Sequence, residues 1–318
     1  MQISIIIINY NTQKLLINCI DSIYNTLKNI DFEIIMCDNA SVDNSCKLVS
    51  KQFPAVKIIK NTSNLGFGKA CNKSAKLAKG KYLLILNTDT ILQPYAIQNL
   101  YNFMEQNKSA GMCGPQLLNA DKSLQNSIDN FASFSTILLN KSLLRFLFPK
   151  RFPGKRVVYK SPVVVESLVG ACMFIRKDVF NKLKGFDEDY FFFFEETDLC
   201  LRLKKNKYNV YFIPDSYVIH LQGKSSEKDI YRIRWEYYKS RYIFLRKNFY
   251  NDFQIKILKV LLCVRLLVNV FSCGIIGVIS DKEKYLLKSK VYWHIFTKHI
   301  NYNKEIKNIK EIEDEFKE

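Results

Sequence analysis

Short, continuously apolar runs alternate with segments of helical length along the first ninety residues. Ile3–Ile8 is such a run, rich in β-branched residues, and strands that are buried on both faces of a parallel sheet have this composition. The runs are residues 3–8, 32–37, 56–59 and 82–86, and the helical segments are residues 14–27 and 69–78. This alternation predicts an α/β protein with a Rossmann-like, doubly wound and mostly parallel sheet flanked by helices.

Polar residues follow three of these runs directly. They are Tyr10 and Asn11, Asp38 and Asn39, and Asn87 and Asp89. In open α/β sheets the ligand binds beyond the carboxyl ends of the strands, so the fold would gather these side chains at one rim. Gly66 and Gly68 flank Phe67 in a nearby loop, where glycine lets the backbone approach a phosphate or a base closely. The alternative is a simple turn, because the third glycine of a dinucleotide fingerprint is missing.

An aromatic wall, residues 191–194, runs into three carboxylates at Glu195, Glu196 and Asp198. Acids at a helix N-terminus lie in the positive end of the helix dipole, and apolar neighbours can tune their protonation. The alternative is an amphipathic helix in which the acids favour the first turn and Arg202 pairs with Asp198 at i,i+4.

Composition narrows the classes of partner. The chain has 48 lysines and arginines against 30 aspartates and glutamates, a formal net charge of +18. This excess predicts an acidic partner, either nucleic acid, anionic lipid or a phosphorylated small molecule. The nine cysteines are odd in number and lack metal-binding spacing, which indicates reduced thiols in the cytosol. No signal-peptide pattern precedes the first strand, so we expect no export.

The second half begins with an irregular stretch, residues 125–162, of the kind that often covers active sites. Further strands are expected at residues 163–169, 170–175, 210–213 and 217–219, the last leading to His220. We expect a first domain at residues 1–250 and a C-terminal helical region at residues 251–318.

Residues 258–279 of that region are strongly apolar but contain Arg265. Burying an arginine at the centre of a bilayer costs about 2.5–3.5 kcal/mol, whereas each apolar residue gains only about 0.3–0.6 kcal/mol. Basic residues surround the segment, which favours a helix lying on the anionic inner face of the membrane. The alternative is a helix packed on the first domain or in a homodimer.

Eight blocks of residues, in order, resemble family 2 glycosyltransferases, with the bacterial rhamnosyltransferase-like branch closest. The resemblance covers about residues 1–250. The blocks are Ile7-Ile8-Asn9-Tyr10-Asn11, Asp38-Asn39-Ala40-Ser41-x-Asp43, Asn64-x-Gly66-Phe67-x-x-Ala70-x-Asn72, Asn87-x-Asp89, Gly170-Ala171-Cys172-Met173, Phe186-Asp187-Glu188, Glu195-Glu196-x-Asp198-Leu199 and His220-x-x-Gly223-x-Ser225.

The resemblance implies a GT-A fold and inverting transfer of a sugar from a nucleotide diphosphate donor, with Mn²⁺ or Mg²⁺. Asp89 matches the last acid of the family's Asp-x-Asp metal element, in which Asn87 replaces the first acid, and His220 would be a further metal or diphosphate contact. The nucleotide-sugar site implied by the resemblance comprises Tyr10, Asn11, Asp38, Asn39, Asn64, Gly66, Phe67, Asn72 and Asn87. Asp38 would accept the ring N–H of uracil or thymine while Tyr10 stacks on the base; the alternatives are a capping aspartate and a packed tyrosine.

The resemblance also places the catalytic base, which takes the proton of the acceptor hydroxyl, at Glu195 or Glu196. The family commonly has Glu-Asp where this chain has Glu-Glu, and Glu196 is slightly favoured because it occupies the Asp position. Asp198 would orient the helix start or the acceptor, and Arg202 would hold it. Gly170 and Ala171 belong to the acceptor side, where Ser167 replaces a frequent tryptophan.

The predicted function is transfer of rhamnose or another hexose from a dTDP- or UDP-linked donor to a hydroxyl of a glycan acceptor. The preferred acceptor is lipid-linked, for surface polysaccharide synthesis at the inner face of the cell membrane. One alternative is a nucleotide-sugar binder without catalysis. A basic nucleic-acid-binding protein is another, although the chain has no recognisable binding motif of that class.

Overall fold

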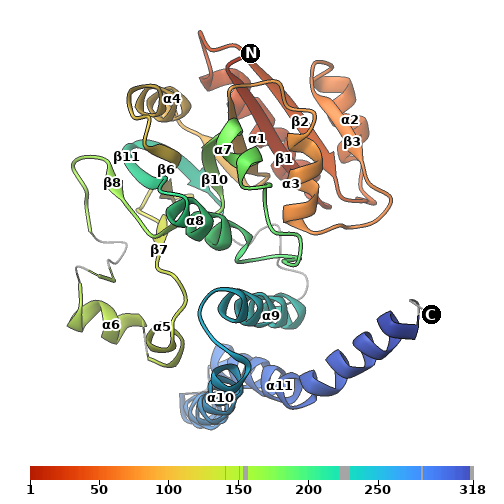
Figure 1. The fold of residues 1–318 in the computed structure, drawn as a ribbon, viewed down its shortest axis with the longest axis vertical. Coiled ribbons are helices and arrows are strands. Elements are labelled where there is room, and N and C mark those ends of the chain that lie inside the picture. The colour runs from red at the N-terminus through yellow and green to blue at the C-terminus, as the bar shows by residue number, and fades with distance from the viewer. Residues whose placement is uncertain (140, 150, 153–156, 222–229, 281, 316–318) are drawn as a thin grey trace. The chain divides into compact units, whose positions relative to one another are not determined.

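The computed structural model describes residues 1–318 apart from 140, 150, 153–156, 222–229, 281 and 316–318. Within these residues the chain divides into two compact units (Figure 1). The first comprises residues 1–131 and 141–227, and the second comprises residues 132–140 and 228–318. The second unit therefore begins before residue 251 and includes a short segment from the irregular stretch.

The first unit is built on a nine-stranded sheet with the order β3-β2-β1-β4-β10-β6-β11-β5, in which β8 also pairs with β11. The strands are β1 (Ile3–Asn9), β2 (Phe32–Asp38), β3 (Lys57–Lys60), β4 (Tyr82–Asn87), β5 (Thr90–Leu92), β6 (Ala110–Leu118), β8 (Val163–Val164), β10 (Cys172–Arg176) and β11 (Asn209–His220). β1 to β4 are parallel to their neighbours within this group, whereas β10 runs antiparallel to both β4 and β6. The predicted α/β class and mostly parallel sheet are confirmed.

Helices cover both faces of this sheet (Figure 1). They are α1 (Gln13–Thr26), α2 (Ser45–Gln52), α3 (Phe67–Ala75), α4 (Ala96–Gln106), α7 (Lys177–Lys182) and α8 (Glu195–Lys205). Ile5 of β1 faces one core with Leu16 of α1, and Ile6 faces the other core with Cys71 of α3. Successive residues of a strand point to opposite faces, so the continuous isoleucine run supplies both cores.

Two segments differ from the predicted strands. Residues 210–213 and 217–219 belong to one long strand, β11, whose pairing with β6 shifts register between Ile213 and Tyr217. Residues 163–169 divide into β8 and a short strand β9 (Ser167–Leu168), which pairs with β7 (Ile128–Asp129). The first unit also contains α6 (Lys141–Leu147).

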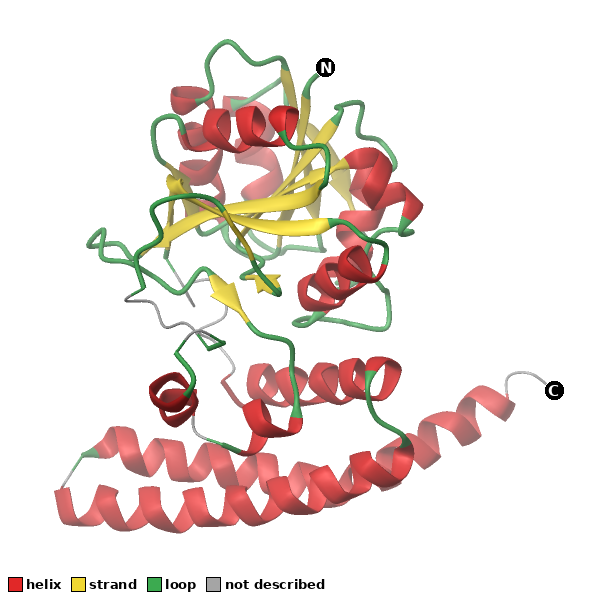
Figure 2. Ribbon diagram, turned by 60° about the vertical axis from the view of Figure 1, so that its left-hand side comes forward, coloured by secondary structure: helices red, strands yellow, loops and turns green. Residues whose placement is uncertain are grey.

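The second unit is helical, with α5 (Phe134–Leu138), α9 (Ile230–Asn248), α10 (Asp252–Ser280) and α11 (Glu283–Glu315). α10 and α11 run side by side (Figure 2). Leu266 of α10 packs with Val291 and Ile295 of α11, and Ser289 donates a hydrogen bond to the Val270 carbonyl at 2.8 Å. A Cβ on Gly277 would lie 2.7 Å from Leu286 Cδ2, so a small residue permits this close approach.

Within the described residues, α10 alone is long and apolar enough to cross a membrane by length and composition. Its inner face contacts protein: Leu258, Leu262 and Leu266 are buried, and Arg265 donates a hydrogen bond to the carbonyl of Ile137 in α5. The arginine that makes spanning costly therefore lies on the side of α10 that faces the rest of its unit.

Candidate functional site

The carboxylate of Asp38 is held at the ends of β1 and β2. Asn9 Nδ2 donates to Asp38 Oδ1 at 2.8 Å, and the backbone N–H of Ser41 donates to Asp38 Oδ2 at 3.0 Å. Asn11 is fixed to the same loop, because its N–H donates to Ser41 Oγ at 2.9 Å and its Oδ1 accepts from Val42 N–H at 2.8 Å. These contacts give Asp38 one fixed orientation at the strand ends.

Tyr10 follows β1 directly and is 47% exposed. An exposed aromatic ring beside a buried carboxylate offers a stacking surface next to a hydrogen-bond acceptor. The positions of Tyr10 and Asp38 at the ends of the first two strands predicted that they share one rim, and the structure places both residues at that edge.

A chain of hydrogen bonds fixes the loop that carries Gly66. Asn39 Nδ2 donates to the Gly66 carbonyl at 3.1 Å, Asn61 Nδ2 donates to Asn39 Oδ1 at 2.8 Å, and Lys73 Nζ donates to Asn61 Oδ1 at 2.6 Å. Asn64 Oδ1 accepts the Gly66 N–H at 3.0 Å. Asn39 and Asn64 therefore shape the loop, with Asn61 and Lys73 as supports that sequence analysis did not single out.

This loop is joined to the aromatic wall. Gly66 has φ +81°, and a Cβ there would lie 2.4 Å from the Phe191 carbonyl oxygen, so the position requires glycine. The next residue, Phe67, donates its N–H to the same carbonyl at 3.0 Å. The glycine loop and the acidic helix start are thus held against each other although 125 positions separate Gly66 from Phe191 in the sequence.

The two glutamates at the start of α8 have different surroundings. Glu195 is 4% exposed and lies beneath α3, since a Cβ on Gly68 would be 3.9 Å from Glu195 Cβ. Among the described residues its Oε2 has no hydrogen-bond partner. Burial, and then the charge of Glu196, raise the pKa of Glu195 well above its usual range.

Glu196 is partly exposed and lies against Gly170, where a Cβ would be only 3.3 Å from Glu196 Cγ. Burial raises the pKa of Glu196 to about 7, and the negative charge of Asp129 at the end of β7 acts in the same direction. The absence of a side chain at Gly170 therefore permits the close approach of Glu196, a carboxyl group whose pKa suits proton transfer near neutral pH.

Gly170 connects Glu196 to the end of β4. The next residue, Ala171, accepts a hydrogen bond from the Asn87 N–H at 3.0 Å, and Asp89 follows two residues later. The acidic start of α8 and the end of β4 therefore lie at the same edge of the sheet.

Asp89 and His220 form a buried pair. Asp89 Oδ1 lies 3.5 Å from His220 Nε2, and the side chains are 2% and 10% exposed. Gln125 donates Nε2–H to the His220 carbonyl at 3.0 Å, so its Oε1, 2.7 Å from His220 Nδ1, accepts from that nitrogen. In a neutral imidazole this bond leaves the lone pair on Nε2, facing Asp89.

This pair fits part of a divalent cation site. Neighbouring ligands of an octahedral ion with bonds of about 2.0–2.1 Å lie about 3 Å apart, so these two donors, 3.5 Å apart, need to approach each other only slightly to share one cation. Within the described residues no cluster of three or more His, Cys, Asp or Glu side chains could hold a metal, so the remaining ligands would come from a bound diphosphate or water. Gly223 and Ser225 of the His220 block lie outside the described residues.

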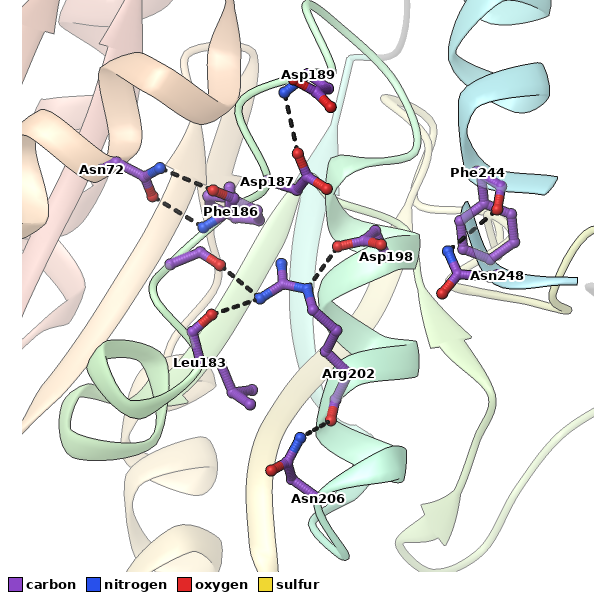
Figure 3. Close-up of polar contacts among 11 residues, drawn as sticks. Asn72, Leu183, Phe186, Asp187, Asp189, Asp198, Arg202, Asn206, Phe244 and Asn248 are labelled. Carbon is purple, nitrogen blue, oxygen red and sulfur yellow. Dashed lines mark hydrogen bonds and ion pairs between the residues drawn. The ribbon is translucent and has the colours of Figure 1, made fainter. Parts of the chain in front are cut away.

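Asn72, Asp198 and Arg202 make contacts that stabilise the fold around the site (Figure 3). Asn72 donates Nδ2–H to the Phe186 carbonyl at 2.8 Å and accepts the Phe186 N–H at 2.9 Å. Arg202 Nε lies 2.6 Å from Asp198 Oδ2, which confirms the i,i+4 pair. Arg202 Nη1 also donates to the Leu183 and Gly185 carbonyls at 2.8 Å. These bonds hold the turn that leads into the aromatic wall.

Gln125 and Asp129 are two further site neighbours that sequence analysis missed. Gln125 orients His220, and Asp129 raises the pKa of Glu196. Both come from the irregular stretch, which was expected to cover an active site but offered no motif that would identify single residues.

Comparison with known proteins is consistent with this geometry. The model of the family "Glycosyl transferase family 2" matches residues 4–184. The N-acetylglucosaminyl-diphospho-decaprenol L-rhamnosyltransferase of Mycobacterium tuberculosis is 27% identical over 67% of this chain and 74% of its own length. Rhamnosyltransferase WbbL of Escherichia coli is 28% identical over 49% of this chain and 60% of its own.

Among solved structures, GalNAc-T7 with UDP, GalNAc and Mn²⁺ has a TM-score of 0.56 and 15% identity, over 80% of this chain and 49% of that one. This likeness concerns the fold and supports the GT-A architecture. The family match covers more than half of the chain and includes the three strand ends described above. The chain therefore belongs to glycosyltransferase family 2.

Proposed function

We propose that this enzyme transfers a hexose, of the rhamnose type, from a dTDP- or UDP-linked donor to a hydroxyl of a lipid-linked glycan, with inversion. The observation that carries the proposal is the position of Glu196 beside Gly170, at the sheet edge that also holds Asp38 and Asp89. One edge thus offers a donor site and a proton acceptor. The mycobacterial relative is by name a rhamnosyltransferase of a diphospho-decaprenol glycan, which supports the choice of sugar and acceptor.

The donor would lie along the strand ends. Tyr10 stacks on the base, Asp38 accepts its ring N–H, and the backbone of the Gly66 loop approaches the ribose and diphosphate. Asp89 and His220 hold Mn²⁺ or Mg²⁺. The cation, when bound, stabilises negative charge on the leaving diphosphate.

Glu196 is the base in this proposal. Its carboxylate accepts the proton of the acceptor hydroxyl while the oxygen attacks the anomeric carbon from the side opposite the diphosphate, which gives inversion. A base whose pKa lies near the working pH combines a high ionised fraction with a useful affinity for the proton, and the pKa of Glu196 is about 7. Glu195 is enclosed beneath α3 and supports the helix start.

The second unit provides membrane attachment in this proposal. α10 exposes an apolar stripe at intervals of three or four residues, which consists of Phe253, Ile257, Val260, Val264, Val268, Phe271 and Ile275. A spanning orientation is disfavoured because α11 packs along α10 and carries Lys284, Lys288 and Lys290, which would enter the hydrocarbon with it. The pair of helices α10 and α11 is therefore proposed to lie in the plane of the anionic inner surface of the membrane.

Glu196→Gln should lower transfer by about 10²–10⁴-fold, the range for loss of a general base, while donor binding is retained. Transfer and donor binding are measured together for Glu196→Gln, Glu195→Gln and the double variant. Asp21→Asn, an exposed carboxylate change on α1, is the matched control. A double variant with undiminished transfer would show that neither glutamate is the base.

Asp129→Asn should shift the acidic limb of the pH–rate profile to lower pH. The base must be ionised, so transfer rises as pH rises through the pKa of Glu196, about 7. Removing the neighbouring negative charge lowers that pKa. The measurement is the ratio of the transfer rates at pH 6 and pH 8, taken for the unmodified chain and for Asp129→Asn. The same ratio in the two proteins would mean that Glu196 does not control the acidic limb.

Asp89→Asn should weaken the metal-dependent part of donor binding. A ligand that binds only the folded state raises the melting temperature according to its affinity. A screen of nucleotide sugars with and without Mn²⁺ is expected to give a Mn²⁺-dependent increase for the unmodified chain and a much smaller one for Asp89→Asn. Equal increases in both proteins would remove Asp89 from the metal site, and Asp21→Asn again serves as the control.

Charges placed in the apolar stripe should release the protein from membranes. We expect the triple variant Val260→Glu, Val264→Glu, Val268→Glu to reduce the fraction of protein that floats with anionic vesicles at least about tenfold. Each change replaces apolar surface that the membrane would bury with a negative charge that anionic lipids repel. Val42→Glu, a change at a 93% exposed position of the first unit, should leave flotation unchanged. Equal flotation of the triple variant would exclude the stripe as the anchor.

A further inference from the structure

A pocket of about 410 Å³ lies between α9 and α11, entirely within the second unit. It is lined by Tyr231, Arg232, Trp235, His294 and Lys298. The α9 residues lie on one helical face by their i, i+1, i+4 spacing, and the two α11 residues are four apart. Tyr231 meets the His294 ring at a centroid distance of 5.0 Å. We call this cavity the α9–α11 pocket.

The lining suits an acidic ligand. Arg232 and Lys298 supply two positive charges, and none of the five lining residues is acidic. The surroundings are basic too, because residues 230–301 contain 14 lysines and arginines against four aspartates and glutamates.

The lining also suits an apolar group. Tyr231 and Trp235 supply aromatic surface, and Trp235 is only 7% exposed. The volume of about 410 Å³ falls in the range of small-molecule sites, roughly 300–1,000 Å³. Each water in the liquid occupies about 30 Å³, so the five heavy atoms of a phosphate, counted at that volume, fill less than half of the pocket. The remaining volume has room for an adjoining apolar group.

We propose that the α9–α11 pocket binds the phosphate or diphosphate head of a membrane lipid. Arg232 and Lys298 pair with the phosphate oxygens, and the aromatic rings contact the first part of the lipid chain. The apolar stripe of α10 places this unit at a membrane, where such heads are abundant. The two sources of this chemistry are the isoprenoid carrier of the acceptor and the anionic phospholipids of the bilayer. The inference rests on the proposed membrane attachment for both sources and on the proposed acceptor for the first source alone.

The test uses the fluorescence of Trp235 in the full-length protein. The chain has two tryptophans, and Trp293 is 51% exposed on α11, so Trp293→Phe leaves Trp235 as the single reporter. Farnesyl diphosphate, inorganic pyrophosphate and vesicles of phosphatidylcholine with or without phosphatidylglycerol are titrated separately. We expect a saturable change with farnesyl diphosphate or with the phosphatidylglycerol vesicles, and weaker binding of pyrophosphate.

In the Trp293→Phe background, Arg232→Gln with Lys298→Gln should weaken this binding at least about tenfold, as expected when bonds to a charged group are lost. Arg234→Gln with Lys290→Gln, a pair of exposed changes on the same helices, should bind the soluble probe, farnesyl diphosphate, within about twofold of the parent. Arg232→Lys with Lys298→Arg should restore binding, which separates lost charge from a damaged fold.

The relative response to the two probes identifies the lipid. A tighter response to farnesyl diphosphate assigns the pocket to the isoprenoid carrier, and a tighter response to phosphatidylglycerol vesicles assigns it to phospholipid. Unchanged binding in the Arg232→Gln, Lys298→Gln protein, or pyrophosphate binding as tight as that of both lipids, would overturn the proposal. Donor binding and transfer are read separately, so failure of this inference is distinguishable from failure of the proposed function.

Discussion

The hydrogen bond from the Asn87 N–H to the Ala171 carbonyl joins the two parts of the site. β10 runs antiparallel to β4, so the start of β10 lies beside the end of β4. Gly170 then places Glu196 at the edge where Asp89 follows β4. The parallel half of the sheet thereby carries Asp38 and Asp89, and β10, which runs antiparallel to β4, brings Glu196 to the same edge.

The electrostatics of this edge oppose the stability of the fold. The pKa values of Glu195 and Glu196 are both raised, mainly because the surrounding protein removes water from their carboxyl groups, so their contribution to folding is fully present below the ordinary glutamate pKa. It is lost as pH rises through the raised values. Their place in the first turn of α8 offsets part of this cost through the helix dipole. The chain thus keeps a pair of acids with raised pKa values at this edge despite their cost to stability, and such perturbed groups are common at functional sites.

Sequence alone predicted the parallel half of the fold and most of the strand-end residues, because apolar runs and the polar residues after them are local patterns. Asp38 and Asp89 could be found this way. The position of Gln125 beside His220 depends on β6 and β11 pairing across nearly a hundred residues of sequence. The position of Asp129 depends on the pairing of β7 with β9, and no local pattern records either contact. Asn72 matched a motif, yet its amide is engaged by the Phe186 backbone, a contact that only the folded chain shows.

The most direct test of the central claim is a crystal structure with Mn²⁺ and an unreactive nucleotide-sugar analogue. The account predicts the base of the nucleotide on Tyr10 and Asp38, the cation on Asp89 and His220, and the free face of the anomeric carbon directed toward Glu196. A donor bound with its anomeric carbon away from both glutamates would contradict it.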